Sequence, residues 1–147
     1  MNLEKKLMED LKTSMKKKDT IRKNTITMVR AAVKQIQVDE RREVSDEEII
    51  EIISKQLKEK RLAIEDFKKG NRDDLVDLTN KEIDILLDYL PKQLTEAEVE
   101  EVVENSIKEV GATSMKDIGL VMKTVMPKVK GKTDGNIVSK IVKEKLV

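Results

Sequence analysis

The chain has 147 residues, of which 40% are charged and 1% are aromatic, and it contains no cysteine, tryptophan or histidine. The missing cysteine excludes disulfides and thiolate metal sites, and the missing histidine excludes an imidazole base and a Ser-His-Asp triad. Only Phe67 and Tyr89 carry rings that could stack on a nucleobase, which argues against an aromatic RNA-binding platform.

The apolar content of 38% is enough for a folded core. No apolar run reaches the roughly 18 residues of a transmembrane helix, and the beginning Met-Asn-Leu-Glu-Lys-Lys lacks the apolar region of a signal peptide. We therefore expect a cytoplasmic protein that does not associate with a membrane.

The net charge of +1 conceals three blocks of different sign. Residues 1–43 carry 12 basic and 7 acidic side chains, residues 44–109 carry 10 and 19, and residues 110–147 carry 8 and 3. A basic tail behind an acidic middle can recognise a polyanion, whereas the simpler interpretation is that solvated helix faces vary in sign.

Four helices are expected before Pro91, because apolar residues recur at intervals of three and four. Asp19 or Thr20 can cap the second helix, and the capping box Ser45-Asp46-Glu47-Glu48 opens the third, which Gly70-Asn71 ends. Their expected inward-facing residues are Leu3, Leu7, Leu11, Ile21, Met28, Ala32, Ile36, Ile49, Ile53, Leu57, Ile64, Phe67, Leu75, Leu78, Ile85, Leu86 and Leu90.

Three more helices are expected after Pro91. A second capping box, Thr95-Glu96-Ala97-Glu98, opens a helix that Gly111 closes. Ser114 can cap the next, which we expect Pro127 to end because its ring collides with the preceding turn. The last helix follows Asp134-Gly135. Without any sustained alternation of period two, the sequence predicts an all-α fold of two helical domains, a four-helix bundle at 1–91 and a three-helix domain at 92–147.

Two apparent motifs carry no chemistry. Gly131-Lys132-Thr133 lacks the rest of a P-loop, since Met126 stands where the first glycine belongs. Acidic pairs such as Asp73-Asp74 fall on expected exposed faces and lack the spacing of a calcium loop. We therefore predict no catalytic residue, no metal site and no cofactor.

The methionines fall at helical spacing, and we expect them to fill irregular gaps in the core rather than to form a peptide-binding groove. They are Met8, Met15, Met28, Met115, Met122 and Met126.

Lysines gather near the carboxyl end, around a connection between a proline and a glycine. Lysine is a flexible point charge suited to phosphate, and the start of the last helix adds backbone N–H groups. We predict an RNA-contact surface there, with a solubilising rim as the alternative; its residues are Lys123, Lys128, Lys130, Lys132, Lys140 and Lys143. A glycine inside a helix, such as Gly119, destabilises it relative to alanine. A close approach of another helix or of a ligand would explain its presence.

The segment from Asp117 to Val138 resembles the signature of the YqeY proteins. That signature also marks the tail domain of the B subunit of the glutamine-dependent amidotransferases acting on Glu-tRNA(Gln) and Asp-tRNA(Asn). The resemblance covers essentially the whole chain, although Lys132-Thr133 stands where the family often has Arg-Ala. It implies that Gly119, Pro127, Gly131, Asp134 and Gly135 shape the connection.

The resemblance implies a tRNA-binding accessory protein in the context of tRNA amidation, without catalysis by this chain alone. One alternative is an adaptor that contacts the amidotransferase or an aminoacyl-tRNA synthetase. A second is an auxiliary role in carbon–nitrogen ligation with glutamine as amide donor, which rests on family association only.

Overall fold

The computed structural model describes residues 2–147, and these form seven α-helices and one short 3₁₀ turn, with no strand among them. The all-α prediction is confirmed. The chain divides into two compact units, residues 1–90 and 91–147, each with its own hydrophobic core.

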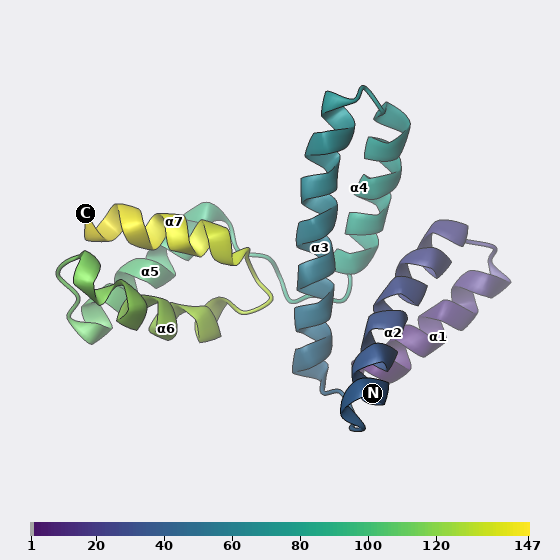
Figure 1. The fold of residues 1–147 in the computed structure, drawn as a ribbon, viewed down its shortest axis with the longest axis horizontal. Coiled ribbons are helices and arrows are strands. Elements are labelled where there is room, and N and C mark those ends of the chain that lie inside the picture. The colour runs from purple at the N-terminus through teal and green to yellow at the C-terminus, as the bar shows by residue number, and fades with distance from the viewer. Residues whose placement is uncertain (1) are drawn as a thin grey trace. The chain divides into compact units, whose positions relative to one another are not determined.

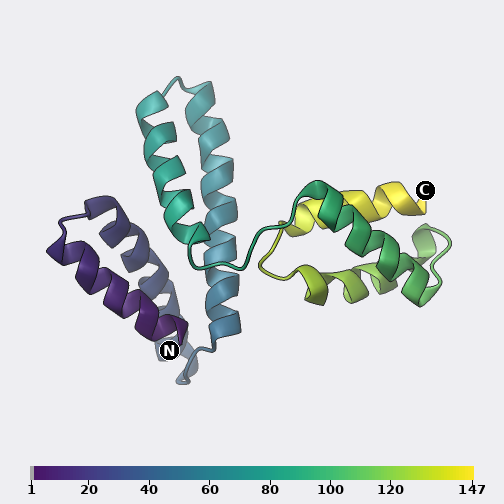
Figure 2. The ribbon, with the colours of Figure 1, turned by 180° about the vertical axis from the view of Figure 1, so that it is seen from behind.

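The N-terminal unit consists of two antiparallel helical hairpins (Figures 1 and 2). Helices α1 (Leu3–Lys16) and α2 (Thr20–Glu40) form the first, and α3 (Asp46–Lys69) and α4 (Asp73–Leu87) form the second. Helix α2 contacts all three others, so its apolar side joins the hairpins. Leu7, Ile26 and Ile49 are among the fully buried side chains of this core.

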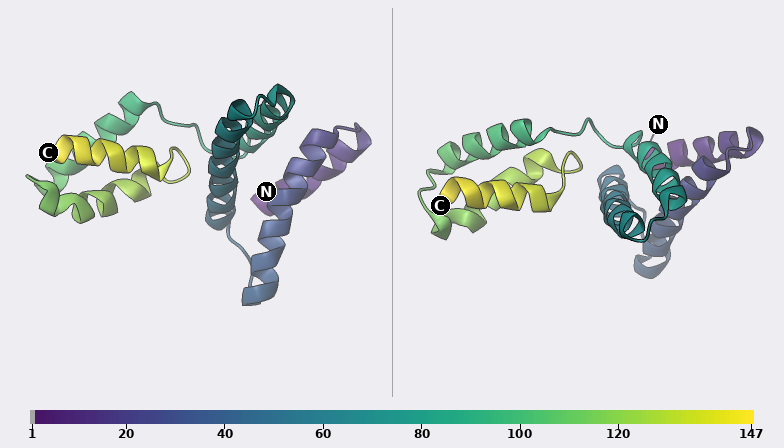
Figure 3. Two further views of the ribbon diagram at one scale, coloured as in Figure 1. Left: turned by 45° about the horizontal axis from the view of Figure 1, so that its top comes forward. Right: turned by 90° about the horizontal axis from the view of Figure 1, so that it is seen from above.

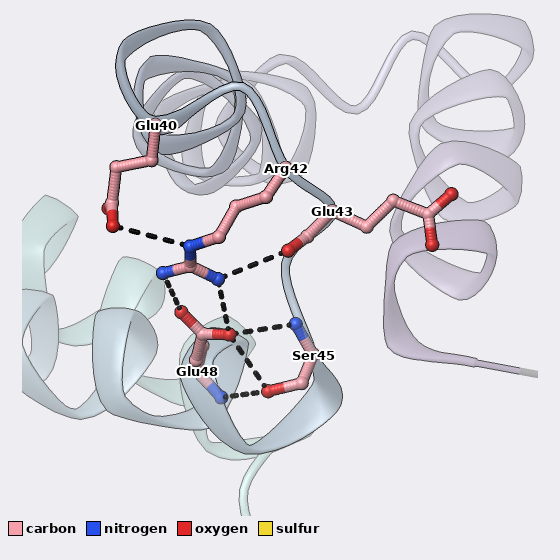
Figure 4. Close-up of polar contacts among 5 residues, drawn as sticks. All are labelled: Glu40, Arg42, Glu43, Ser45 and Glu48. Atoms are coloured by element: carbon pink, nitrogen blue, oxygen red, sulfur yellow. Dashed lines mark hydrogen bonds and ion pairs between the residues drawn. The ribbon is translucent and has the colours of Figure 1, made fainter.

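Short polar signals set the helix ends as the sequence predicts. Asp19 caps α2 by accepting from the Arg22 backbone N–H, and α3 ends immediately before Gly70. At the α2–α3 connection, Glu48 completes the capping box with Ser45 (Figure 4). Its carboxylate also accepts hydrogen bonds from the two terminal guanidinium nitrogens of Arg42, at 2.6 and 2.9 Å. The pKa of Glu48 falls to about 2, because the hydrogen bonds from Arg42 and then from the Ser45 backbone stabilise its carboxylate.

Two expected core positions in this unit are wrong. Met28 is 52% exposed, and the buried line of α2 instead runs through Thr25, Ile26, Val29 and Val33. Thr25 can be buried because its hydroxyl donates to the Ile21 carbonyl, so no polar group is left unpaired. Leu78 lies on the exposed side of α4, and the next residue, Thr79, is buried instead. Phe67 is half-buried.

The C-terminal unit packs three helices around a core of valine and isoleucine (Figure 3). They are α5 (Glu96–Val110), α6 (Ile118–Val129) and α7 (Gly135–Leu146). Gly111 closes α5 with φ +68°, a left-handed conformation that a glycine adopts without strain.

The beginning and end of α6 differ from the prediction. Ser114 forms no side-chain cap; a 3₁₀ turn at Met115–Asp117 precedes the helix. Pro127 does not end the helix, which continues to Val129. The proline lies in the last turn, and Val129 is fully buried against the core, so packing outweighs the hydrogen bond that the proline removes.

Candidate functional site

Helix α6 has one buried side and one exposed side. Val121, Val125 and Val129 recur every four residues and are almost completely buried against α5 and α7. The opposite side is exposed, and we call it the α6 face; its residues are Gly119, Leu120, Lys123, Met126 and Pro127.

Two apolar side chains of the α6 face and one in the turn before it are exposed. Leu120 is 50% exposed and Met126 is 38% exposed, and Met115 in the preceding turn is also exposed. None of these side chains is needed to close the core, because the valines on the other side already fill it. Single exposed apolar residues are common, whereas several within twelve residues of the chain are of interest as a candidate binding surface.

Gly119 has no partner that explains it. A β-carbon built at this position meets no heavy atom within 4 Å, and its φ is not positive. The close helix approach that the sequence suggested is therefore absent among the described residues. The glycine leaves the backbone of the first turn of α6 open from outside.

The expected core packing of the methionines is wrong for most of them. Met122 is half-buried, while the others lie on helix surfaces: Met8, Met15, Met28, Met115 and Met126. The exposed positions of Leu120 and Met126 were missed by sequence reasoning. The four-residue valine spacing was the available signal, because it places positions 119, 120, 123, 126 and 127 away from the core.

Two of the lysines predicted to contact RNA lie on different sides of α6. Lys123 and Lys128 are five residues apart on α6, which places them about 140° apart around the helix. Lys128 turns towards α5, where its ammonium lies 2.7 Å from the Glu109 carboxylate and 3.2 Å from the Ser106 hydroxyl. Lys140 and Lys143 are exposed on α7. Their roles as RNA contacts stay predictions.

The α6–α7 connection is held from the start of the unit. Gln93 donates to the Gly131 carbonyl at 2.7 Å, and the Leu94 N–H donates to the Lys132 carbonyl at 2.8 Å. Lys130 and Lys132 thus flank a fixed turn, in which Gly131 has φ +74°. Sequence reasoning gave Gln93 no role.

The remaining signature residues also have local contacts. Asp134 caps α7 by accepting from the Asn136 N–H at 2.9 Å. A β-carbon at Gly135 would lie 3.6 Å from the Met126 methyl group, which is ordinary contact.

Polar groups of the N-terminal unit are largely paired with one another. A shallow hollow there is lined by Asp10, Thr13, Ser14, Lys17, Asp19 and Arg22. Tyr89 donates to the Asp10 carboxylate, and Arg22 lies within ion-pair distance of Asp19 and Asp88. The pKa of Tyr89 is raised, first by burial of the hydroxyl and then by this hydrogen bond. These contacts give the residues a structural role within the N-terminal unit.

Residues 2–147 lack both a metal-binding cluster and a membrane-spanning helix. They contain no cluster of three or more aspartate and glutamate side chains placed to hold a metal ion. No helix within this range combines the length and apolar character needed to cross a bilayer.

Comparison with known proteins supplies the family. The family model described as "Yqey-like protein" matches residues 4–146, which confirms the resemblance. Three fungal relatives share the name "Altered inheritance of mitochondria protein 41, mitochondrial". The protein of Pyrenophora tritici-repentis is 30% identical over 95% of this chain and 78% of its own length. The Lachancea thermotolerans protein is 35% identical over 67% of this chain and 54% of its own length. The Kluyveromyces lactis protein is 30% identical over 86% of this chain and 69% of its own length.

These names correct two predictions. The relatives are named for the inheritance of mitochondria and not for tRNA binding or amidation, so the predicted role as a tRNA-binding accessory protein in translation is wrong. They are also named as mitochondrial, which overturns the expected cytoplasmic location.

Proposed function

We propose that this chain, which belongs to the Yqey-like protein family over residues 4–146, is a protein-binding module that docks its partner on the α6 face. The observation that carries the proposal is Leu120, a half-exposed leucine beside a glycine whose surroundings are open. Covering Leu120 and Met126 with apolar groups would remove their exposed surface from water, which is favourable at about 25 cal/mol per Å².

Methionine on this surface also supports protein binding. Its unbranched, polarizable side chain adapts to differently shaped apolar partners, and it is frequent on surfaces that bind several targets. Met126 precedes Pro127 on the α6 face, so the partner would meet an adaptable apolar contact next to a rigid one.

Site-specific photo-crosslinking tests the proposal. A benzoylphenylalanine at position 120 should trap a discrete protein in cells that make this chain, with the adduct resistant to nuclease. The matched control carries the same residue at Ala97, which is exposed on α5 of the same unit. The proposal fails if position 120 yields no more adduct than position 97, or if nuclease removes the adduct.

The names of the relatives indicate where to search for the partner. Because three of them are named as mitochondrial, proteins of mitochondria are the first candidates to compare with the trapped band. Mass spectrometry of the adduct identifies both the protein and the segment that lay against Leu120.

A further inference from the structure

The α6 face combines apolar surface with positive charge that the chain itself does not neutralise. Helix α6 contains no acidic residue. Lys123 lies in the middle of the face, and Lys116 lies in the 3₁₀ turn that precedes it. Within residues 2–147 neither lysine makes an ion pair, whereas other lysines of this unit do. Lys128 pairs with Glu109, and Lys145 pairs with Glu100 and Glu104.

The absence of an ion pair at Lys123 limits which molecules can cover the α6 face. An occupant that buries Leu120 and Met126 also removes water from around Lys123, which lies between them along the helix. A cation that loses its water must gain an anionic or strongly polar partner, or binding becomes unfavourable. Carboxylates beside the apolar residues of the occupant would supply that partner.

The shape of the face suits a helix. Leu120 and Met126 are six residues apart, which separates them by about 9 Å along the helix axis and about 120° around it, with Lys123 between them. Apolar residues at positions i, i+3 or i+4, and i+7 of a second helix cover a similar length. Gly119 lacks a β-carbon, and no other atom of the chain occupies that space, so a crossing backbone can approach closely there. The described residues offer no strand edge that an extended peptide could join.

We infer that the occupant of the α6 face is an amphipathic helix of a partner protein whose apolar stripe is flanked by aspartate or glutamate. The inference rests on the proposed protein-binding function. It deepens that function by specifying the chemistry of the partner: an acidic helix that places leucine-like side chains on Leu120 and Met126 and carboxylates near Lys116 and Lys123.

Designed peptides test this chemistry without knowledge of the partner. Two fluorescent helical peptides share one leucine stripe, and their flanking positions are all glutamate in one and all lysine in the other. Anisotropy titrations of the full chain should show saturable binding of the glutamate peptide, with the lysine peptide at least 10-fold weaker. Raising the salt concentration should weaken the glutamate peptide, because charge pairs at the rim of an interface are screened.

Substitutions locate the binding on α6. Leu120→Ala should weaken the glutamate peptide about 10-fold, since it removes half-exposed apolar surface that the peptide would cover. The matched control is Leu62→Ala, which alters a leucine of similar exposure in the N-terminal unit and should leave the affinity unchanged. Lys123→Glu should reduce the preference for glutamate over lysine flanks by about 10-fold, while Lys108→Glu on α5 should not.

Several results would overturn the inference. They are equal affinity for the two peptides, equal effects of Leu120→Ala and Leu62→Ala, or saturable binding to anionic lipid vesicles or RNA with neither peptide binding. Failure of the broader proposal has a different signature, because it would leave position 120 without a specific crosslinked protein. If position 120 traps a protein segment that is basic or extended, protein binding stands and the acidic helix is wrong.

Discussion

Gly119→Ala should stabilise the C-terminal unit, although the glycine lies within a signature segment. The structure shows open space where the new methyl group would lie, with no heavy atom within 4 Å, and an ordinary backbone conformation. Alanine restricts the unfolded chain more than glycine does and has a higher helix propensity.

The expected gain is about 0.5 kcal/mol, the lower end of the glycine-to-alanine range, because position 119 lies in the first turn of α6. Gly111→Ala is the matched control. Its β-carbon would also meet nothing within 4 Å, but the backbone has φ +68°. Alanine in the left-handed region costs roughly 1–2 kcal/mol, so this variant should be destabilised. The two substitutions differ in backbone conformation and not in available space.

Native-state hydrogen exchange of the full chain measures both effects. Peptides from α6 and α7 report on the C-terminal unit alone, whereas the single tyrosine, Tyr89, lies in the N-terminal unit and its fluorescence does not. Protection in α6 and α7 should rise about 2-fold in Gly119→Ala and fall roughly 5- to 30-fold in Gly111→Ala. Lower protection in Gly119→Ala would refute the conclusion that the folded unit leaves room at this position.

Three other predictions concern hydrogen bonds and charges. Tyr89→Phe should destabilise the N-terminal unit by about 1–2 kcal/mol, because it removes a donor from the Asp10 carboxylate. Since folding raises the pKa of Tyr89, the stability that its hydroxyl contributes is complete below the unfolded pKa near 10 and is lost as the pH rises further. Denaturation measured between about pH 8 and 11 should therefore show a steeper loss of stability in the wild type than in Tyr89→Phe. Glu48→Gln should reduce the loss of stability on acidification. The native pKa of about 2 means that the Glu48 carboxylate stabilises the fold at pH values above its unfolded pKa, and that this stabilisation is lost as the pH falls from about 5 towards 2. An unchanged dependence of stability on acid pH would contradict this. Lys128→Met should lower stability by less than about 1 kcal/mol, more at low salt than at high, and a salt-independent effect would argue against its ion pair with Glu109.

Sequence periodicity was reliable where the apolar residues were branched and regularly spaced. Val121, Val125 and Val129 were recognisable as one side of a helix, and the buried Val138 and Val142 likewise mark α7. It failed for residues whose burial depends on a neighbour. Thr25 is polar and yet buried because the Ile21 carbonyl of its own helix accepts its hydroxyl, whereas the apolar Met28 is exposed.

The α6 face likewise has some features that the sequence indicates and others that depend on neighbouring helices. The spacing of the valines could have placed Leu120 and Met126 on the exposed side, but the prediction that methionines fill the core hid this possibility. No sequence pattern indicated that Lys128 would turn towards Glu109 while Lys123 would stay unpaired. That distinction depends on which helix packs on each side of α6.

The helical class, the capping boxes and most helix ends follow from local sequence, because they depend on hydrogen bonds and backbone preferences within a few residues. Packing of the folded chain was needed to show that α6 passes through Pro127 to bury Val129, that the surroundings of Gly119 are open, and that Leu120 is uncovered. Those features depend on the packing of α5 and α7 against one side of α6, and local sequence does not specify contacts between residues far apart in the chain.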